Sequence, residues 1–212
     1  MRHKFYIDLH KGLTFFFILF LIQYFNQWMN YTIMTYLAIH GSYGFMWIIK
    51  SKIFPDKSWD KKVSIAYGLY TWGGLSLYWV SPLIIVTGYF NNGISIEVSP
   101  ILLASSILLF SFGVFLHFTS DMQKYSILNI KNNILIDDGL FKNCRNINYF
   151  GEFLIYSSFS MLSCHWLPFV ILGLFLAIVW IPNMYKKDKS LSRFNDFNEY
   201  KINSKLFIPF IY

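Results

Sequence analysis

The chain has 212 residues, of which 55% are hydrophobic, 21% are aromatic and only 14% are charged. Soluble domains carry about a quarter charged residues, so this composition excludes a soluble domain, a disordered chain and a collagen-like repeat. Two cysteines exclude a disulfide scaffold. The chain has 18 Lys and Arg and 11 Asp and Glu, which gives a net charge of +7. A soluble nucleic-acid binder would place such basic residues on a polar surface, and this composition provides too little of it. We therefore predict an all-helical integral membrane protein.

Long stretches without charged residues mark the predicted membrane spans. They run from Gly12 to Ile49, Val63 to Ile96, Val98 to Ser120 and Phe153 to Tyr185. A membrane-spanning helix needs about 20 apolar residues, so the first and last stretches fit two helices each and the others fit one each. We predict six spans, at roughly 13–30, 33–50, 64–89, 98–119, 149–163 and 166–183.

The positions of Lys and Arg test this count independently. Segments 1–12, 50–62, 120–148 and 184–212 hold three, five, four and six of them, which accounts for all 18. Cationic residues accumulate in cytoplasmic segments, so both termini are predicted to be cytoplasmic, in a bacterial inner membrane or the endoplasmic reticulum. Residues 1–20 also resemble a signal peptide, but the apolar run is too long and no small-residue cleavage site follows, which favours a first span.

Familiar catalytic and cofactor motifs are missing from the sequence. HExxH, GxSxG, Walker and GxGxxG patterns are absent, and no His, Cys or acidic residues have metal-ligand spacing, so we expect no metal site. Cys144 and Cys164 fall on opposite sides of the predicted membrane and are not expected to pair.

Four polar clusters lie within or beside the predicted spans, at 23–31, 40–44, 67–79 and 148–152. Polar groups in a membrane tend to face a cavity or another helix, which makes these clusters candidates for a functional site. Each also has a structural interpretation: interfacial aromatic residues, amides that bridge helices, a wet outer turn, or an acid at a helix N-terminus.

The cytoplasmic segments mix cations with other polar residues, at 120–125, 138–152 and 186–193. Lys and Arg beside a membrane often only attract lipid headgroups. Here they alternate with Asp, Asn, Gln and Tyr, which favours a phosphate-bearing ligand with a polar ring system.

The residues of the third cytoplasmic segment carry a resemblance. Gly139-Leu140-Phe141 followed by Arg145-Asn146-Ile147-Asn148-Tyr149-Phe150-Gly151-Glu152 resembles the G-L-F…R-x-P-N-Y-x-G-E signature of the steroid 5α-reductase-like membrane reductases. Segments 120–124 and 199–210 match the family in order and spacing, and 40–44 is similar to its stretch near the substrate. The resemblance is strongest over 112–212 of what we expect to be one transmembrane domain, 1–212.

The wider superfamily also includes sterol reductases and isoprenylcysteine carboxyl methyltransferases. The methyltransferases usually carry paired glutamates in the tail, and the tail at 186–193 has none, which favours the reductases. Ile147 replaces the signature proline. Steroid-acting members also place a glutamate in an early span, whereas this chain has no acid between Asp8 and Asp56, with Gln23 or Gln27 as the nearest substitutes. The resemblance implies an enone substrate, and the missing glutamate leaves open whether it is steroid-like or another isoprenoid lipid.

The resemblance implies hydride transfer from NADPH to the β-carbon of an enone lipid. Tyr43 is the expected donor to the carbonyl oxygen, supported by Gln27 or His40. The expected cofactor residues are Asp121, Lys124, Arg145, Asn148, Tyr149, Glu152, Lys187, Arg193 and Tyr200. Of these, Asp121, Asn148 and Glu152 would hold the nicotinamide and ribose, with Tyr149 nearby, and Arg145, Lys187 and Arg193 would bind phosphates.

Two other functions stay open on the sequence. One is an S-adenosylmethionine-dependent methyltransferase acting on isoprenylcysteine or phospholipids, and the other is a non-catalytic sterol-binding membrane protein. In each case the expected partners are lipids rather than nucleic acid. A monomer is compatible with the sequence.

Overall fold

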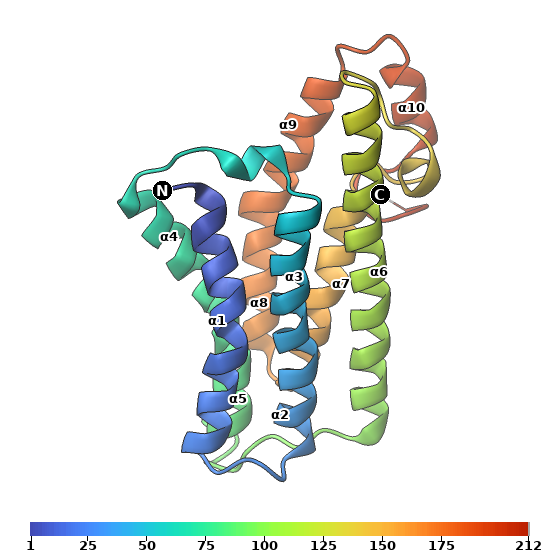
Figure 1. Ribbon diagram of the computed structural model, residues 1–212. Helices are drawn as coiled ribbons and strands as arrows, with labels where there is room; N and C mark the ends of the chain where they lie inside the picture. The colour runs from blue at the N-terminus through green and yellow to red at the C-terminus, as the bar shows by residue number, and fades with distance from the viewer. Residues whose placement is uncertain (212) are drawn as a thin grey trace. The chain divides into compact units, whose positions relative to one another are not determined.

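The computed structural model describes residues 1–211, which form an all-helical protein (Figure 1). The α-helices are α1 (His3–Tyr24), α2 (Tyr31–Tyr36), α3 (Ser42–Ile53), α4 (Ile65–Ser76), α5 (Val80–Thr87), α6 (Pro100–Ile130), α7 (Ile147–Leu162), α8 (Trp166–Phe175), α9 (Ile181–Leu191) and α10 (Phe197–Asn203). Short π-helical segments join α2 to α3 and α8 to α9, and a 3₁₀ turn joins α4 to α5. Over the described residues, extended pairing is limited to two isolated bridges.

Four helices are long and apolar enough to cross a membrane: His3–Tyr24, Ile65–Thr87, Pro100–Ile130 and Trp166–Leu191. They expose large apolar side chains, such as Phe16 of α1 and Phe112 of α6, as helices facing lipid do. This supports the predicted class, an integral membrane protein. The two other predicted spans correspond to the contiguous helical segments from Tyr31 to Ile53 and to α7.

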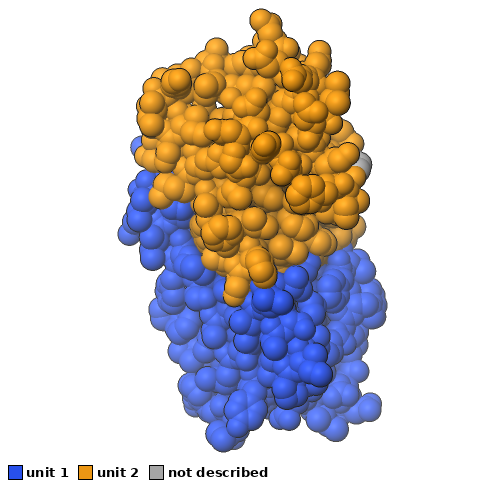
Figure 2. All heavy atoms as spheres, turned by 90° about the vertical axis from the view of Figure 1, so that its right-hand side faces the viewer, with its two compact units in different colours: residues 1–110, 156–171 blue, residues 111–155, 172–212 orange. Residues whose placement is uncertain are grey.

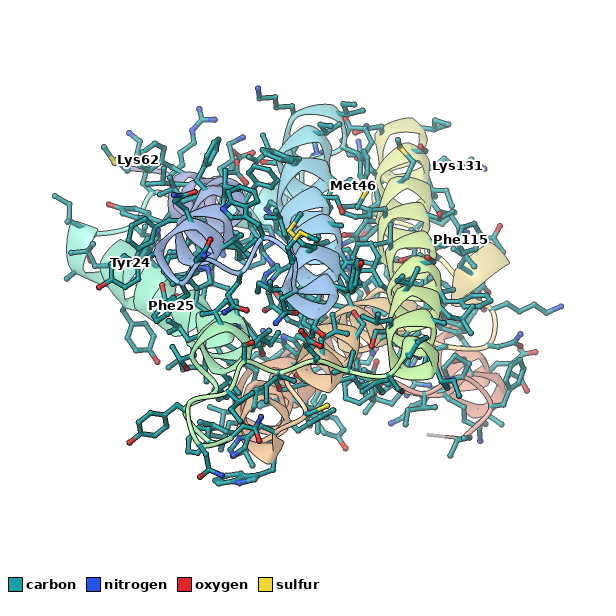
Figure 3. All side chains as sticks on the ribbon, turned by 90° about the horizontal axis from the view of Figure 1, so that it is seen from below. Tyr24, Phe25, Met46, Lys62, Phe115 and Lys131 are labelled. Carbon is teal, nitrogen blue, oxygen red and sulfur yellow. The ribbon has the colours of Figure 1, made fainter. Side chains whose placement is uncertain are left out.

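Several helix boundaries differ from the sequence prediction; the last apolar helix, for example, continues to Leu191 rather than ending at 183. The first helix begins at His3 and ends at Tyr24, rather than covering 13–30, so it includes charged and polar residues that the sequence placed outside the span. Figure 3 shows Tyr24 and Phe25 where α1 ends. Helix α6 continues to Ile130, beyond the predicted end at 119. Hydropathy marks where the apolar stretch lies but not where the helical hydrogen bonds begin and end, which explains these differences.

The contacts divide the chain into two compact units (Figure 2). Unit 1 consists of residues 1–110 and 156–171, and unit 2 of residues 111–155 and 172–212. Helices α6, α7 and α8 contribute residues to both. The single domain expected from the sequence stays a prediction.

Unit 1 is built on the contact between α1 and α3. Gly44 of α3 lies against the backbone carbonyl of Lys11, so that the two helices approach more closely than a larger residue would allow. Asn30 starts the next helix: its side chain accepts hydrogen bonds from the backbone N–H groups of Thr32 and Ile33. The π-helical segment Leu37–Gly41 then brings His40 into the buried interior. Such segments are frequent at functional sites.

Unit 2 is built on an equally close contact, between α6 and α7. A Cβ atom on Gly151 would lie 2.6 Å from the backbone nitrogen of His117, and one on Gly113 would lie 2.7 Å from the carbonyl oxygen of Gly151. Only glycine fits at this spacing, because any side chain would force the two backbones apart. This contact holds the polar ends of α6 and α7 together.

Candidate functional site

The predicted site residues divide between the two units. Tyr43, Gln27 and His40, the expected catalytic residues, lie in unit 1, and all nine expected cofactor residues lie in unit 2. Each group is described within its own unit.

Tyr43 of unit 1 packs beside a buried cation, Lys11. The side chain of Lys11 is 4% exposed, and its Nζ donates a hydrogen bond of 2.5 Å to the hydroxyl of Tyr156. Nζ also lies 4.4 Å, 4.9 Å and 5.0 Å from the ring centroids of Tyr43, Trp47 and Tyr156. Aromatic faces attract a cation through the negative face of their quadrupole, so these rings stabilise the ammonium away from water. The sequence had placed Lys11 among the cytoplasmic charges.

Trp47 connects this cluster to a small polar cavity. Its indole nitrogen donates to Asp8 at 3.1 Å, and Ser51 donates to the second oxygen of the same carboxylate at 2.7 Å. Lys50 is also buried, 4.6 Å from the Trp47 ring. The cavity has a volume of about 20 Å³, room for a single water molecule, and Lys4 and Asp56 also line it.

The other two residues expected at the carbonyl have partners of their own. The Nδ1 atom of His40 is 2.9 Å from the hydroxyl of Tyr36, and the imidazole stacks on Phe159 at 4.1 Å. Gln27 lies between α1 and α2, where its amide oxygen accepts from Asn30 at 3.2 Å. The structure therefore places Lys11, which the sequence did not predict as a site residue, beside Tyr43.

In unit 2, Asp121 and Asn148 meet at the contact between α6 and α7. The Asn148 amide nitrogen donates to the Asp121 carboxylate at 3.3 Å, and the Nε2 atom of His117 lies 4.0 Å from the other carboxylate oxygen. The Asn148 amide oxygen is buried, and no described residue donates a hydrogen bond to it. Glu152 follows one helical turn later, half-buried. The site therefore offers carboxylate and amide acceptors to a ligand that carries N–H or O–H donors.

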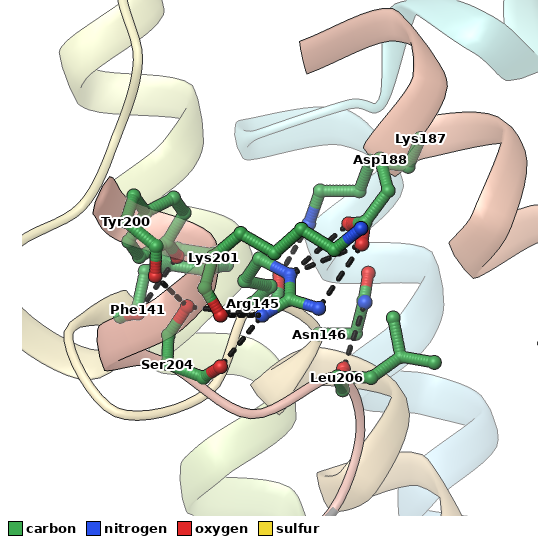
Figure 4. Close-up of polar contacts among 9 residues, drawn as sticks. All are labelled: Phe141, Arg145, Asn146, Lys187, Asp188, Tyr200, Lys201, Ser204 and Leu206. Atoms are coloured by element: carbon green, nitrogen blue, oxygen red, sulfur yellow. Dashed lines mark hydrogen bonds and ion pairs between the residues drawn. The ribbon is translucent and has the colours of Figure 1, made fainter. Parts of the chain in front are cut away.

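Arg145 is 5% exposed and holds together segments that are distant in sequence (Figure 4). Its Nε and Nη2 atoms donate to the carboxylate of Asp188 at 3.0–3.2 Å, and Nη1 donates to the Ser204 carbonyl at 2.6 Å and the Lys201 carbonyl at 3.2 Å. Lys187 donates to the Arg145 carbonyl at 2.6 Å. A phosphate at this guanidinium would have to compete with Asp188, so the contacts give Arg145 a structural task that the sequence did not predict.

The residues around Arg145 fix the C-terminal segment in the same way. The Tyr200 hydroxyl donates to the Phe141 carbonyl at 2.8 Å, and burial raises the pKa of this phenol. Asn146 donates to the Leu206 carbonyl at 2.8 Å. The Cys144 thiol donates to the Phe207 carbonyl, and burial raises the pKa of the thiol to about 11. The signature string thus binds the C-terminal segment through side-chain hydrogen bonds to backbone carbonyls.

The remaining cofactor candidates of unit 2 have separate surroundings. Arg193 is exposed and donates to Asn133 at 3.2 Å, and the ring of Tyr149 is 5.9 Å from that of Trp180. Lys124 is half-buried in α6.

A cavity of about 430 Å³ in unit 2 is lined in part by Arg145, Tyr185, Asp188, Lys189, Ser192 and Lys201. In Figure 4 the side chain of Lys201 extends toward Asp188. The sequence missed Lys189 and Lys201 as members of one cavity. The clustering of lysines in the tail was the signal available. Within residues 1–211, no group of three or more His, Cys, Asp or Glu side chains is placed to hold a metal ion.

Residues 51–202, well over half of the chain, match a family model described as "Protein of unknown function (DUF1295)". No curated protein and no solved structure matches the chain.

Proposed function

We propose that this chain, which belongs to the DUF1295 family, a family that includes steroid 5α-reductase-like proteins, is a membrane-embedded, NADPH-dependent reductase of an enone lipid. The observation that carries the proposal is the pair formed by Asp121 and Asn148 in unit 2. This pair presents acceptors to a ligand, and the Asn148 amide oxygen is buried without a donor among the described residues. Buried polar atoms are nearly always paired, so this oxygen calls for a donor from a ligand.

The hydrogen-bond acceptors and cations of unit 2 fit a dinucleotide, which carries an amide, ribose hydroxyls and phosphates. Asn148 and Glu152 lie one turn apart on the same face of α7 and accept hydrogen bonds from an amide N–H or a hydroxyl. Lys124, Lys187 and Arg193 are the cations assigned to the phosphates. Lys189 and Lys201, which line the cavity of about 430 Å³, add two further cations to unit 2. When bound, NADPH would supply the hydride.

Unit 1 is assigned the task of stabilising negative charge on the substrate. As an enone accepts a hydride, its carbonyl oxygen becomes negative, and one donor aimed at such an oxygen is worth roughly 3 kcal/mol. The phenol of Tyr43 is that donor in the proposal. The nearby Lys11 ammonium supplies a positive charge that favours the negative oxygen, and this charge takes the place of the support expected from Gln27 or His40. A low-polarity interior strengthens the effect.

The proposal includes a topology of six spans with both termini cytoplasmic. In this topology the four apolar helices are four of the spans, and the segment from Tyr31 to Ile53 and α7 are the other two. The cationic loops and tail then lie on the cytoplasmic side, where NADPH is found, and Lys11 lies inside the first span.

The test uses purified protein in detergent or vesicles. We expect NADPH to bind and to be oxidised when a 3-oxo-4-ene steroid or another isoprenoid enone is added. Glu152→Gln abolishes NADPH binding, because an amide replaces one of the two acceptors of the carboxylate by a donor. The matched control is Glu97→Gln, which alters an exposed acid of unit 1. Tyr43→Phe keeps NADPH binding and lowers turnover by about 10²–10³-fold.

Two results would overturn the proposal in favour of a different function. Thermal stabilisation by S-adenosylmethionine but not by NADPH would indicate a methyltransferase. Lipid binding that survives Tyr43→Phe, with no turnover of any enone, would indicate a sterol-binding protein without catalysis.

A further inference from the structure

The cavity of about 430 Å³ in unit 2 is lined by both exposed and buried side chains. The exposed ones are Tyr185, Lys189, Ser192 and Lys201, and the buried ones are Arg145, Asp188, Phe197 and Leu206. Because half of the lining is exposed, a molecule from outside the protein can reach this cavity. Its volume lies in the range of small-molecule sites. The proposed reaction assigns no step to it.

The cavity carries an excess of positive charge. Its lining includes three cations, Arg145, Lys189 and Lys201, and one carboxylate, that of Asp188. Arg145 binds this carboxylate at 3.0 Å, so the two form a pair without net charge. Among the described residues, neither Lys189 nor Lys201 forms an ion pair. Two exposed ammonium groups are therefore left to attract an anionic ligand, and Lys is a common phosphate binder.

The same cavity has apolar walls. Phe197 and Leu206 are 4% and 7% exposed, and the ring of Tyr185 lines the cavity with them. A small hydrophilic anion such as inorganic phosphate would leave these walls uncovered. An amphipathic molecule covers them with its apolar part, which is favourable, while its anionic group meets the lysines. The lining therefore fits a ligand that carries an anionic group beside an apolar part.

The apolar helix from Trp166 to Leu191 indicates the level of the cavity in a membrane, because it contributes Tyr185, Asp188 and Lys189 to the lining. Trp166 and Tyr185 are both exposed, and Trp and Tyr are enriched at the two membrane surfaces. Tyr185 follows Trp166 by 19 residues, or about 29 Å of helix. The hydrocarbon core of a bilayer is about 30 Å thick. Tyr185 therefore marks a membrane surface, and Lys189, one turn further on, lies at the level of the lipid headgroups.

We propose that this cavity binds the headgroup of one anionic glycerophospholipid. Lys189 and Lys201 hold its phosphate, and Tyr185 and Phe197 contact the glycerol and the start of the acyl chains. The lining comes from α9, from α10 and from Leu206 beyond them, so a bound lipid joins these segments and stabilises this end of unit 2. The inference does not depend on the reductase reaction, because an anionic phospholipid is neither its cofactor nor its substrate.

Lys186 provides a matched control on the same helix. It is exposed, carries the same charge and precedes Lys189 by three residues, but it does not line the cavity. General attraction between anionic lipids and basic residues acts on every lysine near the membrane surface. It therefore predicts similar losses for Lys186→Gln, Lys189→Gln and Lys201→Gln. A binding site in the cavity predicts that the last two variants lose more.

The experiment uses the full chain purified in a neutral detergent. Phosphatidylglycerol, phosphatidylcholine with the same acyl chains, and glycerol 3-phosphate are added separately. Thermal unfolding follows binding, and native mass spectrometry counts the lipids retained. We expect phosphatidylglycerol to raise Tm by about 2–4 °C and to be retained as a single molecule, whereas the other two have little effect.

The lysine variants are then titrated with phosphatidylglycerol. Lys189→Gln and Lys201→Gln should each weaken its binding about fivefold, and Lys186→Gln less than about twofold. All three lysines are exposed, so the variants should fold and unfold at the Tm of the unmodified protein when no lipid is added.

Several outcomes contradict the lipid site. Equal Tm shifts from phosphatidylcholine and phosphatidylglycerol, or no shift from either, would refute it, and so would equal losses from Lys186→Gln and Lys189→Gln. A shift from glycerol 3-phosphate as large as that from phosphatidylglycerol would make the ligand a soluble phosphate compound instead. Displacement of the lipid by NADPH would assign the cavity to the cofactor, so that the lipid site fails while the proposed function stands. Lipid binding by a protein that neither binds nor oxidises NADPH would have the reverse meaning.

Discussion

Lys11 of unit 1 and Arg145 of unit 2 are both buried cations, yet different chemistry holds each of them. Arg145 donates to the Asp188 carboxylate and to backbone carbonyls, as its planar fork of donors allows. Lys11 is surrounded by aromatic faces and donates to the phenol of Tyr156.

In the proposed function, this difference separates a cation that fixes the fold from one that lies beside the substrate oxygen. The charge of Arg145 is balanced by a neighbouring carboxylate, so it serves mainly to fix α9 and the C-terminal segment. Lys11 lies against the aromatic faces of Tyr43, Trp47 and Tyr156, so its positive charge is close to the Tyr43 side chain. The sequence pointed to Arg145 as a ligand-binding residue and did not single out Lys11. The contacts add a structural role to Arg145 and place Lys11 beside Tyr43, and the binding role of Arg145 stays a prediction.

The largest expected effect comes from breaking the Arg145–Asp188 pair. Arg145→Met leaves a buried carboxylate without its partner and should lower the free energy of unfolding by about 3–5 kcal/mol, measured by denaturant or thermal unfolding. Arg193→Met, which removes an exposed arginine, should cost less than about 1 kcal/mol. Adding Asp188→Leu to Arg145→Met should recover much of the loss. Equal small losses for the two arginine variants would show that the pair does not hold unit 2 together.

A smaller loss is expected from Lys11. Lys11→Met keeps the apolar stem and removes the charge, so it should cost about 2 kcal/mol, the value of a desolvated cation–aromatic interaction. Under the proposed function it should also lower turnover while leaving NADPH binding in place. Lys50→Met is the control, because Lys50 is also buried over Trp47. If both variants lose the same turnover, the special position of Lys11 beside Tyr43 is refuted.

The helix contacts of the two units can be compared through their glycines. Gly44→Ala in unit 1 and Gly151→Ala in unit 2 each push a methyl group into the facing backbone, and each should cost about 1–3 kcal/mol of unfolding free energy. Gly73→Ala and Gly173→Ala meet nothing within 4 Å, and each should stabilise its helix by up to about 1 kcal/mol. Thermal unfolding should therefore show a lower Tm for the first two variants and a higher Tm for the other two. A Tm change in the same direction for all four would argue against close helix packing.

The smallest effect concerns the two cysteines, one in each unit. Burial raises the pKa of Cys144 to about 11 from an ordinary 9.0, so its reactive thiolate should be roughly a hundredfold scarcer at pH 8 and should increase as pH rises. The folded state therefore binds the Cys144 proton more tightly than the unfolded state does, which stabilises the fold below pH 9. This stabilisation is lost as pH rises from 9 through 11. A maleimide should label exposed Cys164 first. Faster labelling of Cys144 would show that the C-terminal segment opens readily.

Much of the architecture follows from local patterns. Charge-free apolar stretches predict the four long apolar helices, and the string from Gly139 to Glu152 predicts a segment rich in polar contacts. The sequence did not predict that α1 begins at His3, because Asp8, His10 and Lys11 look like the end of a flanking segment. Nor did it predict Asp188 as the partner of Arg145, since nothing in the spacing of two residues so far apart links them.

The sequence by itself determined the class of the protein, because hydropathy and the positions of charges are properties of short segments that persist in any fold. Tertiary structure alone decided what each polar residue does. Whether a cation near a span faces water, a carboxylate or aromatic rings depends on which helices touch it, and glycines such as Gly44 and Gly151 set those contacts. The burial of Lys11 and the structural task of Arg145 both arise from such packing.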